Sequence, residues 1–220
     1  MEARMTVPED RCRLVLIVPD IADIELQAKV VADALRGGDV ASVIIPQYGL
    51  DDGAFQKHAE KLVPAVQAAG AAALIAGDSR VAGRVKADGL HIAGNRTELA
   101  DAVEKFVPKL IVGGSAADRH GALEVGELRP DYIFFGKLDG DIKPEAHPKN
   151  LALGEWWASM VEIPCIVMGG TDPQSALEVA LTGAEFVALR TAVFADPAAA
   201  PSIVAQVNAL LDEKAPRFED

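Results

Sequence analysis

The chain alternates short apolar runs with longer amphipathic stretches, and this alternation repeats eight times. The short runs are nearly continuous in aliphatic residues, which is typical of strands covered on both faces. They predict strands at Leu14–Val18, Val40–Ile45, Ala72–Ala76, Gly89–Ile92, Lys109–Val112, Asp131–Gly136, Ile163–Met168 and Glu185–Leu189. The longer stretches have apolar residues three and four positions apart. They predict helices such as Ile24–Leu35, Gly53–Ala69, Glu98–Phe106, Pro173–Leu181 and Pro201–Leu211.

Eight strand–helix units predict an α/β fold, a closed (β/α)₈ TIM barrel. An open doubly wound sheet is the alternative, but the number of units and the last helix favour the barrel. No Ser/Gly-rich linker or shift in composition divides the chain, so we expect one domain over residues 1–220. Its ends, near 1–12 and 213–220, are expected to fray. Gly70 and Gly183 precede strands and are expected to end helices in the left-handed conformation.

The composition narrows the classes of partner. The chain has 21 Lys and Arg against 33 Asp and Glu, a formal net charge of −12, which disfavours nucleic acid and anionic membranes as partners. No apolar run is long enough to span a membrane, and the start has no secretory apolar region, so we expect a cytoplasmic protein. Cys12 and Cys165 lie at or within apolar runs and are expected to be small buried hydrophobes.

The strongest local signal lies at the ends of the last two predicted strands. Many barrels bind phosphate with the loops after strands seven and eight and a short extra helix. Glycines let a phosphate approach the main chain, and a helix start supplies N–H donors. We therefore expect phosphate binding at Gly169, Gly170, Leu189, Arg190 and Thr191. The plain alternative for the two glycines is a tight strand–helix turn.

Several blocks of sequence resemble the thiamine phosphate synthase family, including its TenI-type relatives. In chain order they are LVLIVPD, ADGLHIAG, LIVGGSAADRHGALEV, DYIFFGKLDGDIK, IPCIVMGG and GAEFVALRTAVF, which together span nearly the whole chain. The resemblance implies an enzyme that joins a pyrimidine methyl diphosphate to a thiazole phosphate and releases pyrophosphate. It implies a small phosphorylated heterocyclic ligand, basic residues that bind pyrophosphate, and Mg²⁺ held by acidic residues after strands three and four.

The resemblance also assigns individual residues. Asp78 matches the magnesium carboxylate with a small shift, Ser115 matches the serine of strand five, and Lys143 stands in for the base of the loop after strand six. Asp78 has an alternative role as a helix cap. Arg96 lies near the family's second acidic ligand, where a cation opposes Mg²⁺ binding. We therefore expect the phosphate end of the site to be kept, and the magnesium–pyrophosphate end stays open.

The histidines and the aromatic pair each allow two interpretations. His91, inside strand four, is either an acid/base at the barrel mouth or a core histidine with its hydrogen bonds satisfied. His58 lies on a predicted helix and is expected to be solvated. The loop 137–150 is either a lid over the mouth or a mobile surface segment. Trp156 and Trp157 pack either on the barrel or on a partner subunit, which leaves a homo-oligomer open.

Three functions remain open from the sequence. The first is the synthase reaction that the resemblance implies. The second is a metal-independent, TenI-like thiazole tautomerase, with His91, His120 or a carboxylate as the acid/base. The third is a non-catalytic relative that binds a phosphorylated ligand. The extent of the resemblance ranks the synthase first.

Overall fold

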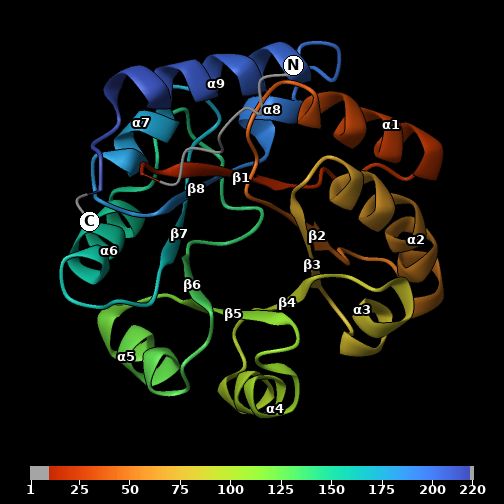
Figure 1. The fold of residues 1–220 in the computed structure, drawn as a ribbon, viewed down its shortest axis with the longest axis horizontal. Helices are drawn as coiled ribbons and strands as arrows, with labels where there is room; N and C mark the ends of the chain where they lie inside the picture. The colour runs from red at the N-terminus through yellow and green to blue at the C-terminus, as the bar shows by residue number, and fades with distance from the viewer. Residues whose placement is uncertain (1–9, 219–220) are drawn as a thin grey trace, which may run out of the picture.

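Eight parallel strands close into a barrel, with β8 paired to β1 (Figure 1). The computed structural model describes residues 10–218 of the 220. The strands are β1 (Arg13–Ile17), β2 (Ser42–Pro46), β3 (Ala72–Ala76), β4 (Gly89–Ile92), β5 (Ile111–Ala116), β6 (Tyr132–Phe135), β7 (Cys165–Met168) and β8 (Phe186–Leu189). The predicted (β/α)₈ barrel is confirmed. The open sheet is wrong, because pairing β8 with β1 leaves no sheet edge.

Helices follow every strand and cover the outside of the barrel. They are α1 (Ile24–Leu35), α2 (Asp52–Ala68), α3 (Ser79–Val85), α4 (Arg96–Phe106), α5 (Arg119–Glu127), α6 (Pro148–Ala158), α7 (Ser175–Ala180), α8 (Thr191–Phe194) and α9 (Ala200–Lys214). Asp23, Asp51 and Asp118 cap α1, α2 and α5 by accepting from a main-chain N–H. Gly70 and Gly183 have φ of +83° and +86°, as expected for helix ends.

Two apolar layers fill the molecule. Inside the barrel, the side chains of alternate strand residues form one cluster, whose members are Val15, Ile17, Ile44, Leu74, Tyr132, Phe134, Ile166, Met168 and Ala188. The other residues of the strands pack outward against the helices in a larger cluster. Both faces of each strand are therefore buried, which explains why the strands read as continuous apolar runs in the sequence.

The fifth strand differs from its prediction. We expected it to end at Val112, but β5 continues through Gly113 and Gly114 to Ala116. A Cβ at Gly113 would lie 2.0 Å from the Tyr132 ring of the neighbouring strand β6. The glycine is thus required by a large side chain inside the barrel, whereas glycine in a sequence usually signals the end of a strand.

The chain ends also differ from expectation where they are described; residues 1–9 and 219–220 lie outside the described residues. Arg11 forms an antiparallel bridge with Arg217, and its side chain is 1% exposed. Its guanidinium binds the Asp212 carboxylate at 2.7 Å and the Asn208 side chain at 3.2 Å. Residues 10–12 and 213–218 are therefore tied together at the base of the barrel, because a buried guanidinium requires such partners.

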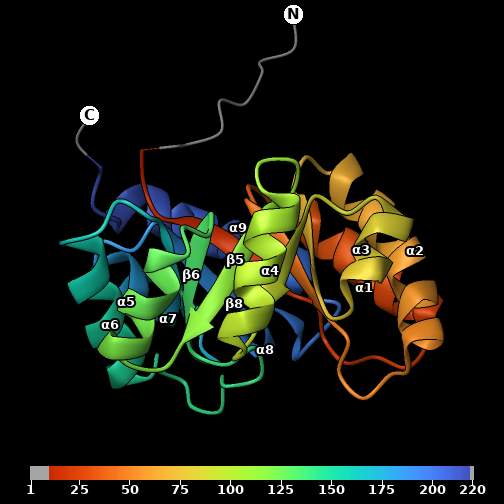
Figure 2. The same ribbon diagram turned by 90° about the horizontal axis from the view of Figure 1, so that it is seen from below.

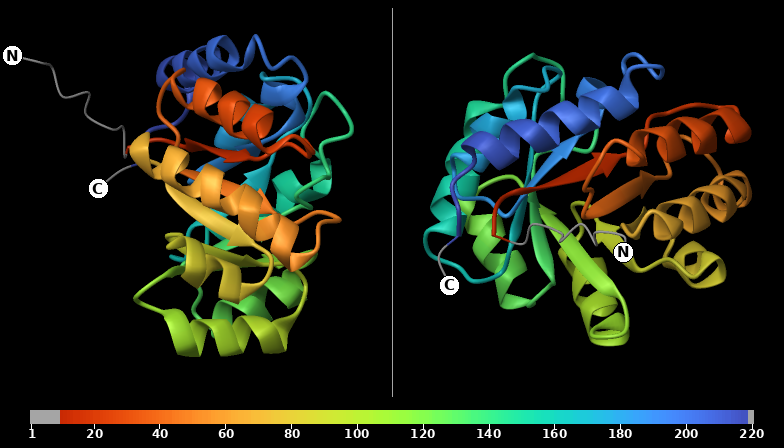
Figure 3. Two further views of the ribbon diagram at one scale, coloured as in Figure 1. Left: turned by 90° about the vertical axis from the view of Figure 1, so that its right-hand side faces the viewer. Right: turned by 45° about the horizontal axis from the view of Figure 1, so that its top comes forward.

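The mouth lies at the carboxyl ends of the strands. In Figure 2 the β5 arrow points toward the end of the barrel where the loop between β6 and α6 protrudes. Figure 3 shows α9 lying along the outside of the barrel, and α9 contacts α1, α7 and α8. Within residues 10–218, no helix has both the length and the apolar character needed to cross a membrane.

The contact between Gly113 and Tyr132 predicts opposite effects for two glycine substitutions. Gly113→Ala should lower the free energy of unfolding by about 1–3 kcal/mol, because the new methyl group overlaps the ring. Gly83→Ala is the control. Gly83 lies inside α3 with open space around it, so alanine should raise stability by about 0.5–1 kcal/mol. Urea unfolding measures both, and equal effects of the two variants would contradict the assignment.

Candidate functional site

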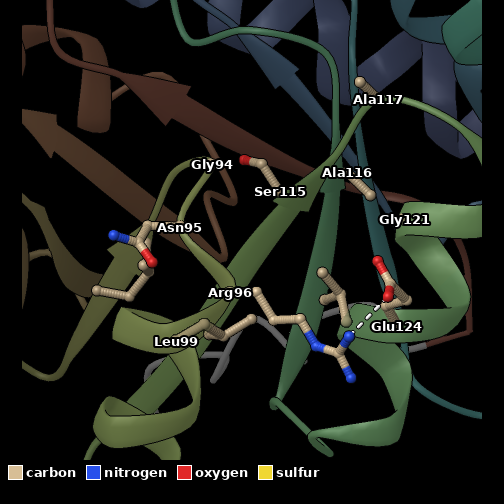
Figure 4. A pocket seen from close by; sticks show the side chains of 11 residues that line it. Gly94, Asn95, Arg96, Leu99, Ser115, Ala116, Ala117, Gly121 and Glu124 are labelled. Atoms are coloured by element: carbon tan, nitrogen blue, oxygen red, sulfur yellow. Dashed lines mark hydrogen bonds and ion pairs between the residues drawn. The ribbon is translucent and has the colours of Figure 1, made fainter.

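Ser115, near the carboxyl end of β5, lines two cavities at the barrel mouth. One, of about 250 Å³, lies between the starts of α4 and α5 (Figure 4). The other, of about 410 Å³, is bounded by the residues that follow β4, β5 and β6, including Lys137 and Leu138. Gly94 also lines both cavities. Small residues after β4 and β5 therefore leave room beside the Ser115 hydroxyl for a ligand of modest size.

Arg96, at the start of α4, lines the smaller of these two cavities and is held in an ion pair. Its guanidinium binds the Glu124 carboxylate at 2.6 Å and reaches Glu127 at 3.5 Å, both on α5. Figure 4 shows the Ser115 side chain directed away from this ion pair. The two carboxylates of α5 neutralise this guanidinium at the wall of the smaller cavity, and its effect on a metal stays a prediction. The expected second acidic ligand is nevertheless missing, because Asn95 occupies the turn and caps α4.

His91 is a core histidine with both ring nitrogens in hydrogen bonds. Its Nδ1 lies 2.9 Å from the Tyr132 hydroxyl, and its Nε2 lies 3.1 Å from Ser115 Oγ. The ring stacks on Tyr132 and meets Phe134 edge-on inside the barrel. Burial lowers the pKa of His91 to about 4, because no charged partner offsets the loss of water. The imidazole is therefore neutral at physiological pH and reaches the cavities only through Ser115.

The turns after β7 and β8 lie together, as expected, but their amides already have partners. Gly169 N donates to Ala188 O at 2.9 Å, which joins the two strands beside Leu189. Gly170 N donates to Ser175 Oγ at 2.8 Å. A Cβ at Gly170 would lie 2.1 Å from the carbonyl oxygen of Pro144. Gly170 therefore lets the loop after β6 approach the main chain, whereas a Cβ at Gly169 would meet Leu189 of β8.

An unforeseen carboxylate lies between Arg190 and Thr191. Asp141 Oδ1 accepts from Arg190 Nε at 3.0 Å and Nη2 at 2.6 Å, and Asp141 Oδ2 accepts from Thr191 N at 2.6 Å. The Asp141 side chain is 0% exposed and that of Arg190 is 20% exposed. A planar carboxylate thus fills the place where the sequence predicted a ligand phosphate. Its donors are a guanidinium fork and a helix-start amide, which also suit phosphate oxygens.

The loop between β6 and α6 is strapped to the barrel rather than loose. Thr171 N donates to Lys143 O at 2.8 Å, and Asp172 N donates to Pro144 O at 3.1 Å. Ala146 N donates to the Glu178 carboxylate of α7 at 2.9 Å. The Lys143 side chain itself is exposed. The start of the loop borders the Ser115 cavity and its middle reaches Arg190, so one segment closes over both halves of the mouth.

Asp78 caps α3 and binds the arginine that follows it. Its carboxylate accepts from Arg80 N at 2.7 Å and pairs with the Arg80 guanidinium. The same guanidinium reaches Asp52 at 3.3 Å, and Asp52 accepts from Gln47 Nε2 at 2.9 Å. These hydrogen bonds from Arg80 lower the pKa of Asp78 to about 2. Asp78 is absent from the lining of both cavities beside Ser115.

Three other side chains differ from, or complete, the sequence picture. His58 is 5% exposed instead of solvated, because its Nδ1 contacts Gln27 Oε1 at 2.6 Å between α1 and α2. Trp157 packs against Phe135 on the outside of the barrel and donates to Ile163 O at 2.7 Å. Trp156 lies against Trp157, with the Arg119 guanidinium over its ring. Cys12 and Cys165 are buried free thiols, as expected.

Sequence reasoning missed Asp141 and Tyr132. Asp141 stands in a mixed-charge loop, where nothing in the sequence indicates its partner 49 residues later. Tyr132 had a weak signal, since Tyr132 and Phe134 alternate along a strand and so face the same side of the sheet. The register that places Tyr132 beside Gly113 and Gly113 beside His91 exists only in the folded sheet.

Comparison with known proteins places the chain in a family. The family model for thiamine monophosphate synthase matches residues 14–193. The thiamine-phosphate synthase of Rhodospirillum centenum is 34% identical over 205 residues, which cover 91% of this chain and 98% of that protein. That of Hyphomonas neptunium is 30% identical, with coverage of 94% and 97%.

The solved structure of thiamine phosphate pyrophosphorylase from Pyrococcus furiosus has the same fold, with a TM-score of 0.77 at 22% identity. The match covers 93% of this chain and 98% of that one. The fold follows from this likeness, and the family follows from the sequence matches over nearly the whole chain. This chain belongs to the thiamine monophosphate synthase family.

Proposed function

We propose that this chain is a thiamine-phosphate-synthase-like enzyme that joins a pyrimidine methyl diphosphate to a thiazole phosphate and releases pyrophosphate. One observation carries the proposal. A cavity beside Ser115 and an arginine–amide cradle at the end of β8 share one barrel mouth, under one loop. The chain's curated relatives over nearly its whole length are thiamine-phosphate synthases, which act on small phosphorylated heterocycles.

The charges at the mouth suit this reaction. Departure of pyrophosphate builds negative charge, which fixed hydrogen-bond donors stabilise in the transition state. Ser115 supplies a hydroxyl at the cavity wall, and Lys137 lines the same cavity. Lys143, exposed on the loop, supplies a further ammonium group for the diphosphate. The protein supplies position and charge, while the thiazole nitrogen is itself the nucleophile, so no protein nucleophile is needed.

The thiazole phosphate binds, in this proposal, at Arg190 and Thr191, beside Gly169 and Gly170. Asp141 now holds the same donors, so a ligand phosphate competes with this carboxylate. A dianionic phosphate offers more charge and more acceptor oxygens than a carboxylate, and it therefore exchanges favourably. The loop after β6 withdraws Asp141 as the ligand enters, which gives that loop the role of a lid.

A Mg²⁺ ion, which the resemblance implies, does not fit the residues present. The Asp78 carboxylate is bound by the guanidinium and main-chain N–H of Arg80, and Asn95 takes the place of the second acidic ligand. Within residues 10–218, no three His, Cys, Asp or Glu side chains gather as a metal site. Asp78 therefore acts in this chain as a helix cap and an ion-pair partner of Arg80.

The tautomerase alternative has less support from the geometry. That reaction needs a base that reaches the substrate with a pKa near neutrality. His91 is buried behind Ser115, and burial lowers its pKa to about 4. His120 lies exposed on α5, 3.9 Å from Glu124. A protein that only binds the precursors would form no product, so an assay of turnover distinguishes it from a synthase.

The first prediction concerns turnover. Purified protein given both phosphorylated precursors should release pyrophosphate and form thiamine phosphate, measured by a coupled phosphate assay and by chromatography. Ser115→Ala should lower kcat/KM about 10- to 100-fold, the loss expected for a hydrogen bond to a charged group. Ser159→Ala, at the far end of α6, is the matched control and should match the parent. A parent that binds both precursors without product would identify a binding protein instead.

The second prediction concerns the carboxylate in the cradle. Asp141→Ala leaves the Arg190 guanidinium without its partner and should lower the free energy of unfolding by about 3 kcal/mol. Inorganic phosphate should restore stability in proportion to its concentration, because it binds the vacated donors. Asp139→Ala removes an exposed charge from the same loop and should change stability by less than about 0.5 kcal/mol, without a phosphate response. Equal phosphate responses in both variants would refute the competition.

The third prediction concerns Asp78. Asp78→Asn keeps the cap acceptor but removes the charge, so at neutral pH it should cost less than about 1 kcal/mol. The pKa of Asp78 in the folded protein is about 2, below the usual 3.8. The ionised carboxylate therefore stabilises the fold fully at pH values above 3.8. That contribution disappears as the pH falls through 2, and the difference between parent and variant in urea unfolding should shrink with it.

The same variant also tests the metal assignment. Calorimetric titration with Mg²⁺ should give no heat of binding in the parent or in Asp78→Asn. Millimolar or tighter binding by the parent that disappears in the variant would make Asp78 a magnesium ligand after all.

A further inference from the structure

A chain of three side chains runs from the barrel interior to the mouth. The Tyr132 hydroxyl lies 2.9 Å from His91 Nδ1, and His91 Nε2 lies 3.1 Å from Ser115 Oγ. Tyr132 and His91 are 5% and 2% exposed, whereas Ser115 lines both cavities of the mouth. The order of donors and acceptors along this chain decides what the Ser115 hydroxyl offers to a ligand.

The Tyr132 hydroxyl, at the buried end of these three side chains, sets which atoms donate and which accept. Burial raises the pKa of Tyr132 above its ordinary value, so the phenol keeps its proton. Within residues 10–218, the only hydrogen-bond partner of that hydroxyl is His91 Nδ1. A buried O–H without an acceptor is costly, and the cost corresponds to roughly a 5- to 150-fold change in population. Tyr132 therefore donates to Nδ1, and Nδ1 must be the unprotonated nitrogen of the ring.

The proton of the imidazole is then on Nε2. A neutral imidazole has one N–H, and burial holds the pKa of His91 near 4, so the ring stays neutral. His91 Nε2–H donates to Ser115 Oγ, which leaves the hydrogen of the serine without an acceptor among residues 10–218. That hydrogen is free to turn into the cavity. The opposite order would leave the Tyr132 O–H unpaired in the barrel interior.

We propose that Tyr132 and His91 are positioning residues that fix Ser115 as a hydrogen-bond donor toward the cavity, where the proposed function places the diphosphate. His91 presents no lone pair to Ser115 in this order. It therefore cannot remove the proton of the hydroxyl, and the triad does not generate a serine nucleophile. The ligand half of this inference rests on the proposed function, whereas the protonation half does not.

A second buried histidine, His58, provides a comparison within the same protein, because its hydrogen bonds require the opposite tautomer. His58 Nδ1 lies 2.6 Å from Gln27 Oε1, and Gln27 Nε2 donates to Pro19 O at 2.8 Å. The amide oxygen thus faces the histidine, and an amide oxygen only accepts. His58 must therefore carry its proton on Nδ1. The two buried histidines are expected to be opposite tautomers of the neutral ring in the same protein.

Nitrogen NMR of the full chain tests the protonation half directly. With ¹⁵N-labelled histidine, long-range ¹H–¹⁵N correlations about two pH units above the ordinary histidine pKa distinguish the two tautomers. We expect Nε2–H for His91 and Nδ1–H for His58. Tyr132→Phe removes the donor to Nδ1, so the single-tautomer pattern of His91 should be lost while that of His58 stays. A parent His91 in the Nδ1–H form would overturn the inference, and that result needs no variant.

Binding of inorganic pyrophosphate tests the ligand half. Titration calorimetry should show affinity about 10-fold weaker in Ser115→Ala than in the parent, and largely restored in Ser115→Thr, which keeps the hydroxyl. The affinity of Tyr132→Phe should fall between those of the parent and Ser115→Ala, because the Ser115 hydroxyl is still present but its orientation is no longer fixed. Equal affinity of parent and Ser115→Ala would refute the donor role. Failure of turnover with this binding pattern intact would refute only the proposed reaction.

Discussion

Asp141 places a negative charge in the protein interior, and its pairing sets the form of the whole mouth. A buried carboxylate is tolerated only when it is paired and fully hydrogen-bonded, and here Arg190 and the amide of Thr191 meet that need. The requirement is mutual, since the guanidinium would otherwise lie mostly buried without a counter-charge. The loop after β6 and the end of β8 are therefore coupled, and neither moves without a replacement partner for the other.

The mouth has two halves with different physics. The β7–β8 half is ionic, because the Asp141 carboxylate is held there by the Arg190 guanidinium and the Thr191 amide. The β4–β6 half has an uncharged wall, where burial keeps Tyr132 and His91 neutral behind Ser115, and its charged lining residues are Lys137 and Asp139 of the loop after β6. The loop after β6 borders both halves. A substrate phosphate in the β7–β8 half and the diphosphate of a second substrate in the β4–β6 half would therefore each meet hydrogen-bond donors beneath one loop.

Local pattern was enough for most of the secondary structure. Strands β3 and β4 and helix α1 have the bounds that the apolar pattern predicts, because a run or stripe of apolar residues is buried whichever partner it meets. The predictions failed where the state of a residue depends on a contact with a residue on another element. Gly113 extends β5 because Tyr132 lies over it, and His58 is buried because Gln27 reaches it from α1. Arg11 is ordered near the start of the described chain because its guanidinium donates to Asp212 and Asn208 of α9.

The sequence by itself determined the barrel, the family and the place of the mouth, because each depends on periodicity and on short blocks of adjacent residues. It also brought Gly169, Gly170, Arg190 and Thr191 into one expected site. Only the tertiary structure decided what those residues bind and how Ser115 is polarised. Hydrogen bonds and ion pairs join residues 24 to 50 positions apart here, and their energies depend on distances and burial that no local pattern contains.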